Sequence, residues 1–142
     1  MKTKKNGGFT LVEILIVVVI LGILAAIVIP QFTQASTEAR ESSLASNLQT
    51  IRSQIELYKI QHSDNWPDTT DLASFTADMC TQGADGFGPY LQQIPVNPFA
   101  TGDVSLSVGA GMGTTATTSH WRINTTDNTF HAHDSDDHYN NF

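Results

Sequence analysis

The chain carries sixteen consecutive apolar or glycine residues, Ile14 to Ile29, with a single carboxylate, Glu13, directly in front of them. Counted from Phe9, the segment up to Ile29 has 21 residues, and a helix of about 31 Å is long enough to span the hydrocarbon core of a bilayer. A carboxylate at the centre of a bilayer costs about 2.5–3.5 kcal/mol on insertion scales, and less near the surface. The run therefore predicts a membrane-spanning helix in which Glu13 needs a compensating partner.

Two ordinary membrane signals share part of this pattern. A secretory signal peptide also begins with a basic segment, here three lysines within the first five residues. Its apolar region of about 7–15 residues, however, contains no glutamate and ends in a small-x-small cleavage site, whereas this run ends at Pro30 and Gln31. A plain signal anchor would use Glu13 only to complement the helix dipole in the first turn.

The apolar run is introduced by the sequence Gly7-Gly8-Phe9-Thr10-Leu11-Val12-Glu13. This motif resembles the prepilin leader of type IV pilins and of type II secretion pseudopilins. The resemblance implies that a prepilin peptidase cleaves after Gly8 and methylates the new amino terminus at Phe9. It also implies that Glu13, the fifth residue of the mature chain, acts in assembly. The chain then divides into a leader (1–8), a transmembrane and assembly helix (9–30) and a domain outside the cytoplasm (31–142).

The charge balance is acidic, with 7 basic and 14 acidic side chains in the whole chain. Without the leader lysines, four basic side chains remain against 14 acidic ones, a net charge of −10 with neutral histidines. This composition argues against nucleic-acid binding, which requires a basic face. The leader lysines keep the amino terminus cytoplasmic before processing, so the rest of the chain is expected on the far side of the inner membrane.

Beyond Pro30, apolar side chains recur at intervals of four, three, four and three residues, which places them on one stripe of a helix: Leu44, Leu48, Ile51, Ile55 and Tyr58. No glycine or proline interrupts residues 31–64, so one helix is predicted from about Phe9 to about His62. We expect a bend at Pro30, which lacks an N–H group, and a second weak point at Gly22. The spacing also fits a coiled-coil seam, but the stripe covers barely two heptads, so we expect it to pack on the rest of the domain.

The remaining segments predict an α+β fold. Residues 70–79 have weak helical character, and residues 104–108 alternate with the period of a half-buried strand. Polar turn residues between 121–124 and 129–133 predict a hairpin whose Trp121 and Ile123 cover the long helix. A small antiparallel sheet packed on the amphipathic half of the long helix is the arrangement these pieces allow, and it is also the pilin-like fold.

The segment Tyr90 to Phe99 resembles the major pseudopilin of type II secretion, in which a Tyr-Leu pair precedes a Pro-x-Asp-Pro-Trp stretch. Here Asn97 stands where that family usually has aspartate, and Phe99 where it has tryptophan. Cys80 is the only cysteine, so the chain also lacks the carboxy-terminal disulfide of many type IV pilins. We expect its thiol to be buried as a small hydrophobic group.

The carboxy-terminal tail combines histidines with three acidic residues, Asp134, Asp136 and Asp137. Major pseudopilins carry a calcium site near the carboxy terminus, and the resemblance makes these oxygen donors the candidate calcium ligands. A solvated acidic tail explains the same residues, so both interpretations stay open. No other cofactor is expected. No catalytic constellation is recognisable, because Cys80 has no glycine elbow or ordered third member beside it, and we expect no enzyme.

The resemblance predicts a structural subunit of a type II secretion pseudopilus. Its expected partners are identical and other pilin-like subunits, the prepilin peptidase, the inner-membrane assembly platform and membrane lipid. A subunit of a type IV pilus is the alternative within the same class. A membrane-anchored adhesin that displays residues 109–119 is the alternative from another class.

Overall fold

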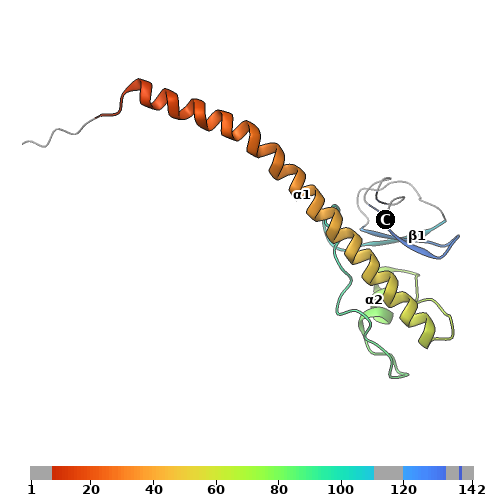
Figure 1. Ribbon diagram of the computed structural model, residues 1–142. Coiled ribbons are helices and arrows are strands. Elements are labelled where there is room, and N and C mark those ends of the chain that lie inside the picture. The colour runs from red at the N-terminus through yellow and green to blue at the C-terminus, as the bar shows by residue number, and fades with distance from the viewer. Residues whose placement is uncertain (1–7, 111–119, 134–137, 139–142) are drawn as a thin grey trace, which may run out of the picture. The chain divides into compact units, whose positions relative to one another are not determined.

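The computed structural model describes residues 8–110, 120–133 and 138. It contains five elements, drawn in Figure 1: α1 (Leu11–Gln61), α2 (Leu72–Cys80), β1 (Leu106–Gly109), β2 (Trp121–Asn124) and β3 (Thr129–Ala132). The chain forms two compact units, Met1–Ala39 and Arg40–Phe142. The first contains the start of α1, and the second contains its remainder together with α2 and the sheet.

Helix α1 confirms the predicted single long helix. It is helical without interruption through Pro30, so the proline does not end it; the bend remains a prediction. The helix stops after Gln61 because Ser63 and Asp64 both take positive φ angles, 56° and 67°. The Asp64 N–H then closes the last turn by donating to the Lys59 carbonyl at 2.8 Å.

The predicted apolar stripe forms one side of the hydrophobic core in the second unit. Four of its members, Leu44, Leu48, Ile51 and Ile55, have at most 2% of their surface exposed. The core is completed by residues of α2 and of the sheet: Phe75, Met79, Leu91, Ile94, Trp121, Ile123, Phe130 and Ala132. Fully burying one such side chain stabilises the fold by about 1.5–3 kcal/mol. The stripe is thus used within its own chain and is not a coiled-coil seam.

The weakly predicted helix exists as α2. Asp71 caps it, because its side chain accepts a hydrogen bond from the Ser74 N–H at 2.8 Å. Phe75 and Met79 are buried on one face, and Leu72 packs partly against the same core. The prediction for residues 70–79 is therefore confirmed with a shift of one or two residues.

The sheet has the order β1-β2-β3 and is mixed. The predicted hairpin is correct, with β2 and β3 antiparallel and Ile123 opposite Phe130. The expectation of an entirely antiparallel sheet is wrong, because β1 pairs with β2 in parallel, Leu106 opposite Trp121. Eleven residues, 110–120, separate these strands, about the length that a parallel crossover needs. Central strand β2 is buried along its whole length.

The segment that resembles the major pseudopilin lies against this sheet. The Trp121 indole N–H donates to the Pro95 carbonyl at 2.7 Å. Asn97 is completely buried; its amide N–H donates to the His120 carbonyl at 3.1 Å and its carbonyl oxygen accepts from the Phe99 N–H at 2.9 Å. An aspartate carboxylate could not make the first of these bonds, which gives the departure at Asn97 a structural role.

Candidate functional site

The amino terminus of α1 is closed by a reciprocal capping box. The Glu13 carboxylate oxygen Oε2 accepts from the Thr10 backbone N–H at 2.7 Å and from the Thr10 hydroxyl at 2.8 Å. In return, the Glu13 backbone N–H donates a hydrogen bond to the Thr10 hydroxyl oxygen Oγ1 at 3.2 Å. The spacing Thr-x-x-Glu is the sequence signature of this motif. Sequence reasoning singled out Glu13 but missed Thr10, although the signature was readable.

The helix behind this cap exposes its apolar surface throughout. From Gly8 to Arg40 every residue is exposed, including Leu24 at 52%. Among the described residues, α1 is the one helix long and apolar enough to cross a membrane. Soluble monomers rarely expose contiguous apolar surface of this extent, and larger patches mark sites of contact with protein or membrane.

The predicted processing and assembly residues are sterically open. A Cβ atom added at Gly8 or at Gly22 would meet nothing within 4 Å, and Phe9 is 84% exposed. Packing within the chain therefore does not require glycine at either position. Pro30 lies within the same exposed stretch of helix. The structure leaves the peptide bond after Gly8 accessible, as a cleavage site has to be.

A polar cluster at the carboxyl end of α1 lines a hollow in the second unit. His62 Nε2 lies 2.9 Å from the Asp85 carboxylate and its Nδ1 lies 2.9 Å from the Tyr58 carbonyl. Tyr58 stacks on the imidazole with ring centroids 3.9 Å apart and donates to Asp78 at 3.2 Å. Burial, together with the Asp78 carboxylate, raises the pKa of Tyr58 to about 12. Both imidazole nitrogens are already engaged, so the cluster ties the 81–90 segment to α1 and offers no base to a nucleophile.

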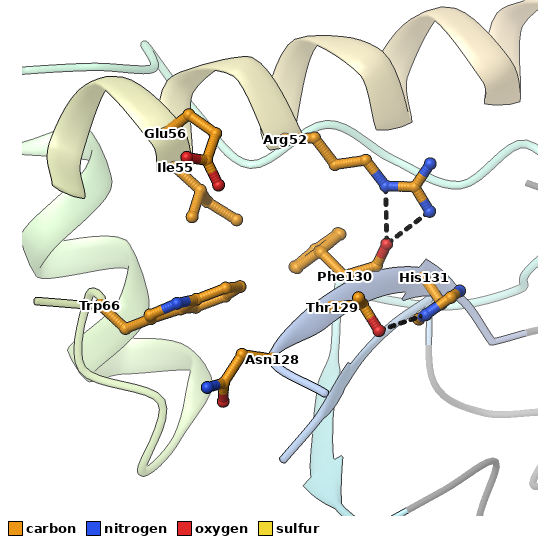
Figure 2. Close-up of a pocket in the computed structure, with 8 residues that line it drawn as sticks. All are labelled: Arg52, Ile55, Glu56, Trp66, Asn128, Thr129, Phe130 and His131. Atoms are coloured by element: carbon orange, nitrogen blue, oxygen red, sulfur yellow. Dashed lines mark hydrogen bonds between the residues drawn. The ribbon is translucent and has the colours of Figure 1, made fainter. Parts of the chain in front are cut away.

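Another hollow, of about 220 Å³, lies between α1, Trp66 and β3 (Figure 2). Its apolar wall is formed by Ile55, Trp66 and Phe130. On one side the Arg52 guanidinium donates two hydrogen bonds to the Phe130 carbonyl, at 2.9 and 2.7 Å. Burial lowers the pKa of Arg52. Within the described sheet β3 is the outer strand, and this arginine occupies one of its carbonyls, which limits strand pairing with other chains.

The comparisons with known proteins agree with these features. The model of the prokaryotic N-terminal methylation motif matches residues 3–29. Type II secretion system core protein G of Pseudomonas aeruginosa is 32% identical over 106 residues, which cover 70% of this chain and 72% of the relative. The protein of the same name from Klebsiella pneumoniae is 30% identical over 110 residues, covering 75% of this chain and 78% of the relative. The chain belongs to the family of type II secretion system core protein G.

A further member of this family, from Dickeya chrysanthemi, is 36% identical over 100 residues, covering 68% of this chain and 65% of the relative. No solved structure matches the chain at a significant level. The relatives are named as components of a secretion system and not for an enzymatic activity. The pseudopilin family thus accounts for the amino-terminal motif and for the α+β domain together.

The candidate calcium ligands of this pseudopilin, Asp134, Asp136 and Asp137, lie outside the described residues. The described histidines near them have other contacts: His133 Nδ1 lies 3.4 Å from the Ser107 hydroxyl, and His138 packs on the Phe99 ring with centroids 4.4 Å apart. Among the described residues no group of three or more potential metal ligands comes together.

Cys80 has a free thiol that is half-buried against the core. Burial raises its pKa, which leaves less of the reactive thiolate at neutral pH. The expected burial is therefore confirmed in part. The loop proposed for an adhesin falls almost entirely on residues 111–119, outside the described part of the chain.

Proposed function

We propose that this pseudopilin is held in the bacterial inner membrane by the exposed half of α1 and is then packed by that half into the helical filament of a type II secretion pseudopilus. The observation that carries the proposal is the combination on one helix of a methylation motif, a capped carboxylate and a membrane-length apolar surface that the chain itself leaves uncovered. Lipid covers this surface before assembly, and neighbouring subunits cover it afterwards. The domain beyond it lies in the periplasm or on the extracellular filament.

Processing precedes assembly in this proposal. A prepilin peptidase cuts the accessible bond after Gly8 and methylates Phe9. Removal of the leader also removes three positive charges, which otherwise anchor the amino terminus on the cytoplasmic side. An assembly platform in the inner membrane then transfers the mature subunit to the filament, beside identical and other pilin-like subunits.

Glu13 has two roles. In the single chain its carboxylate completes the first turn of α1 by binding Thr10. In the filament it compensates the charge of a neighbour's amino terminus, because opposite charges attract far more strongly at low effective dielectric than in water. The cap holds the carboxylate at the start of the helix, where the neighbour's terminus has to reach it.

The helix between Gly22 and Pro30 loses order when the filament forms. Glycine and proline each weaken the helical hydrogen bonds, and freed backbone groups at membrane depth are tolerated only where protein covers them. Before assembly no neighbouring subunits cover this stretch. A filament map with unbroken α-helix through Leu24 and Ala26 would contradict the proposal.

The test of the function is to express the full chain with a type II secretion system and to image sheared surface material by electron microscopy. Filaments labelled by an antibody against this chain, together with export that depends on it, support the pseudopilus. Filaments formed with a type IV pilus machinery but no export defect would point to a pilus instead. Binding of a ligand by the domain without any filament would point to an adhesin.

A further inference from the structure

One basic side chain of the mature pseudopilin stands apart from the rest. The mature sequence contains four basic side chains: Arg40, Arg52, Lys59 and Arg122. Within the described residues, Arg52 donates to a carbonyl of β3, Lys59 pairs with two carboxylates at 3.2 and 3.6 Å, and Arg122 donates to the Ser107 hydroxyl at 3.1 Å. Arg40 is exposed on α1 and has no hydrogen bond or ion pair in the described part of the chain.

The carboxylates divide in the same way. Most of those in the described residues cap a helix, close a turn or pair with a cation, as Asp71, Asp68 and Glu56 do. Three of the described carboxylates make no such interaction: Glu38, Glu41 and Asp103. Two of these lie on α1 within two residues of Arg40, so one cation and two carboxylates without partners are concentrated on a single turn of helix.

These charges cannot neutralise one another within one chain. Residues one or two positions apart on a helix do not face each other. Glu38 and Arg40, two positions apart, project about 160° apart around the axis of α1 at 3.6 residues per turn. One side of this turn therefore presents a cation and the opposite side presents a carboxylate.

We propose that Arg40 of one subunit pairs with Glu38 of a second copy of this chain, so that each helix donates a cation on one side and accepts one on the other. This proposal rests on the proposed filament function. A contact between different faces of identical subunits is heterologous, and repeated contacts of this kind build an open helical assembly. Each mature copy has a net charge of −10, so neighbouring copies repel one another. The pair places the Arg40 cation at their contact, where it offsets this repulsion.

The experiment uses charge exchange in the full-length chain. Arg40→Glu and Glu38→Arg each place like charges at every contact, and the double variant Arg40→Glu/Glu38→Arg restores opposite charges with the sides exchanged. We expect each single variant to lower the yield of sheared filaments about tenfold and the double variant to return it to within about twofold of the wild type. In 1 M salt, where the Debye length is about 3 Å, the loss in the single variants should shrink.

Two controls make the result specific. Asp103→Arg makes the same charge change as Glu38→Arg at an exposed carboxylate that lies outside α1 and should leave the yield near that of the wild type. Leader cleavage on an immunoblot and Trp fluorescence show that each variant is processed and folded. A wild-type chain that forms no filaments refutes the filament function itself. Wild-type filaments with unaffected single variants, or with a double variant that is no better than the singles, overturn the pairing alone.

Discussion

The two ends of α1 differ in the burial of their apolar side chains although they belong to one helix. From Gly8 to Arg40 all residues are exposed and most of those in the apolar run are large and hydrophobic. From Leu44 to Ile55 the apolar side chains are spaced four and three residues apart and are buried in their own domain. The domain buries its apolar stripe within its own chain, whereas the amino-terminal part leaves its apolar side chains exposed, as the proposed insertion and assembly require.

This contrast means that apolar side chains contribute to the stability of the fold in only one part of α1. In the domain, apolar burial is the main term that stabilises the fold. In the amino-terminal part side chains of the same kinds are exposed, so in the proposed function their burial stabilises the inserted or assembled state and not the domain. Substitutions in the two parts should therefore have different consequences even when they are chemically the same.

The largest effect is expected at the cleavage site. Gly8→Arg places a long cation before the scissile bond, and the leader should stay attached and assembly should fail. The melting temperature of the domain should not change, because Gly8 is exposed and a Cβ atom added there would meet nothing within 4 Å. Immunoblot size and filament yield measure the first result. Gly22→Ala, an equally open position, is the processing control, and a fully cleaved Gly8→Arg chain would refute the site.

A pair of identical substitutions tests the contrast within α1. Leu48→Ala removes a side chain that is 1% exposed and should destabilise the domain by about 2–5 kcal/mol. Leu24→Ala removes one that is 52% exposed and should leave domain stability unchanged. Urea unfolding of both full-length variants in detergent, followed by the fluorescence of buried Trp121, gives the comparison. Equal destabilisation would break the distinction between the two parts.

A smaller effect is expected at the cap of α2. The Ser74 N–H bond to the carboxylate holds the pKa of Asp71 below its usual value. The cap therefore stabilises the domain above the unfolded pKa of about 3.9 and loses its effect as the pH falls through the lower folded value. Asp71→Ala should lower the melting temperature by a few degrees at pH 7, with a smaller difference at low pH. Asp71→Asn, which still caps, should lose less; an equal loss in both variants would exclude the capping bond as the cause.

The smallest effect is expected from calcium. If Asp134, Asp136 and Asp137 bind the ion, stability should rise with the logarithm of calcium concentration above its dissociation constant. A solvated tail should respond only to screening, which monovalent salt reproduces. We expect the domain from Gln31 onward to melt at the same temperature in calcium as in chelator with sodium chloride at matched ionic strength. A higher melting temperature in calcium alone would establish the site.

Periodicity was sufficient to predict the helices and the hairpin. The spacing of Leu44, Leu48, Ile51 and Ile55 determines which face of α1 is buried, and polar turn residues determine the β2–β3 pairing. The parallel pairing of β1 was not predictable in this way, because alternation in a short strand indicates a half-buried face and not the direction of its neighbour. That direction depends on how the chain crosses between Gly109 and His120.

The candidate site was predicted in part. The methylation motif, which the family model matches at residues 3–29, could be recognised from adjacent residues because the motif is local in sequence, whereas cleavage after Gly8 and the assembly role of Glu13 stay predictions. The His62–Asp85 pair was missed because its members are 23 positions apart and neither belongs to a motif. The role of Asn97 was also not apparent, because its partner His120 comes beside it only when the sheet forms.

The most direct test of the account separates the two functions of Glu13. Glu13→Ala removes both the cap and the charge, whereas Glu13→Gln keeps a capping side chain and removes only the charge. We predict that both variants are cleaved to the size of the wild type on an immunoblot and that both assemble poorly, since the charge is what a neighbour's amino terminus requires. Normal filament yield from Glu13→Gln would reduce the residue to a helix cap, and normal filaments from Glu13→Ala would contradict the central claim that this carboxylate drives assembly.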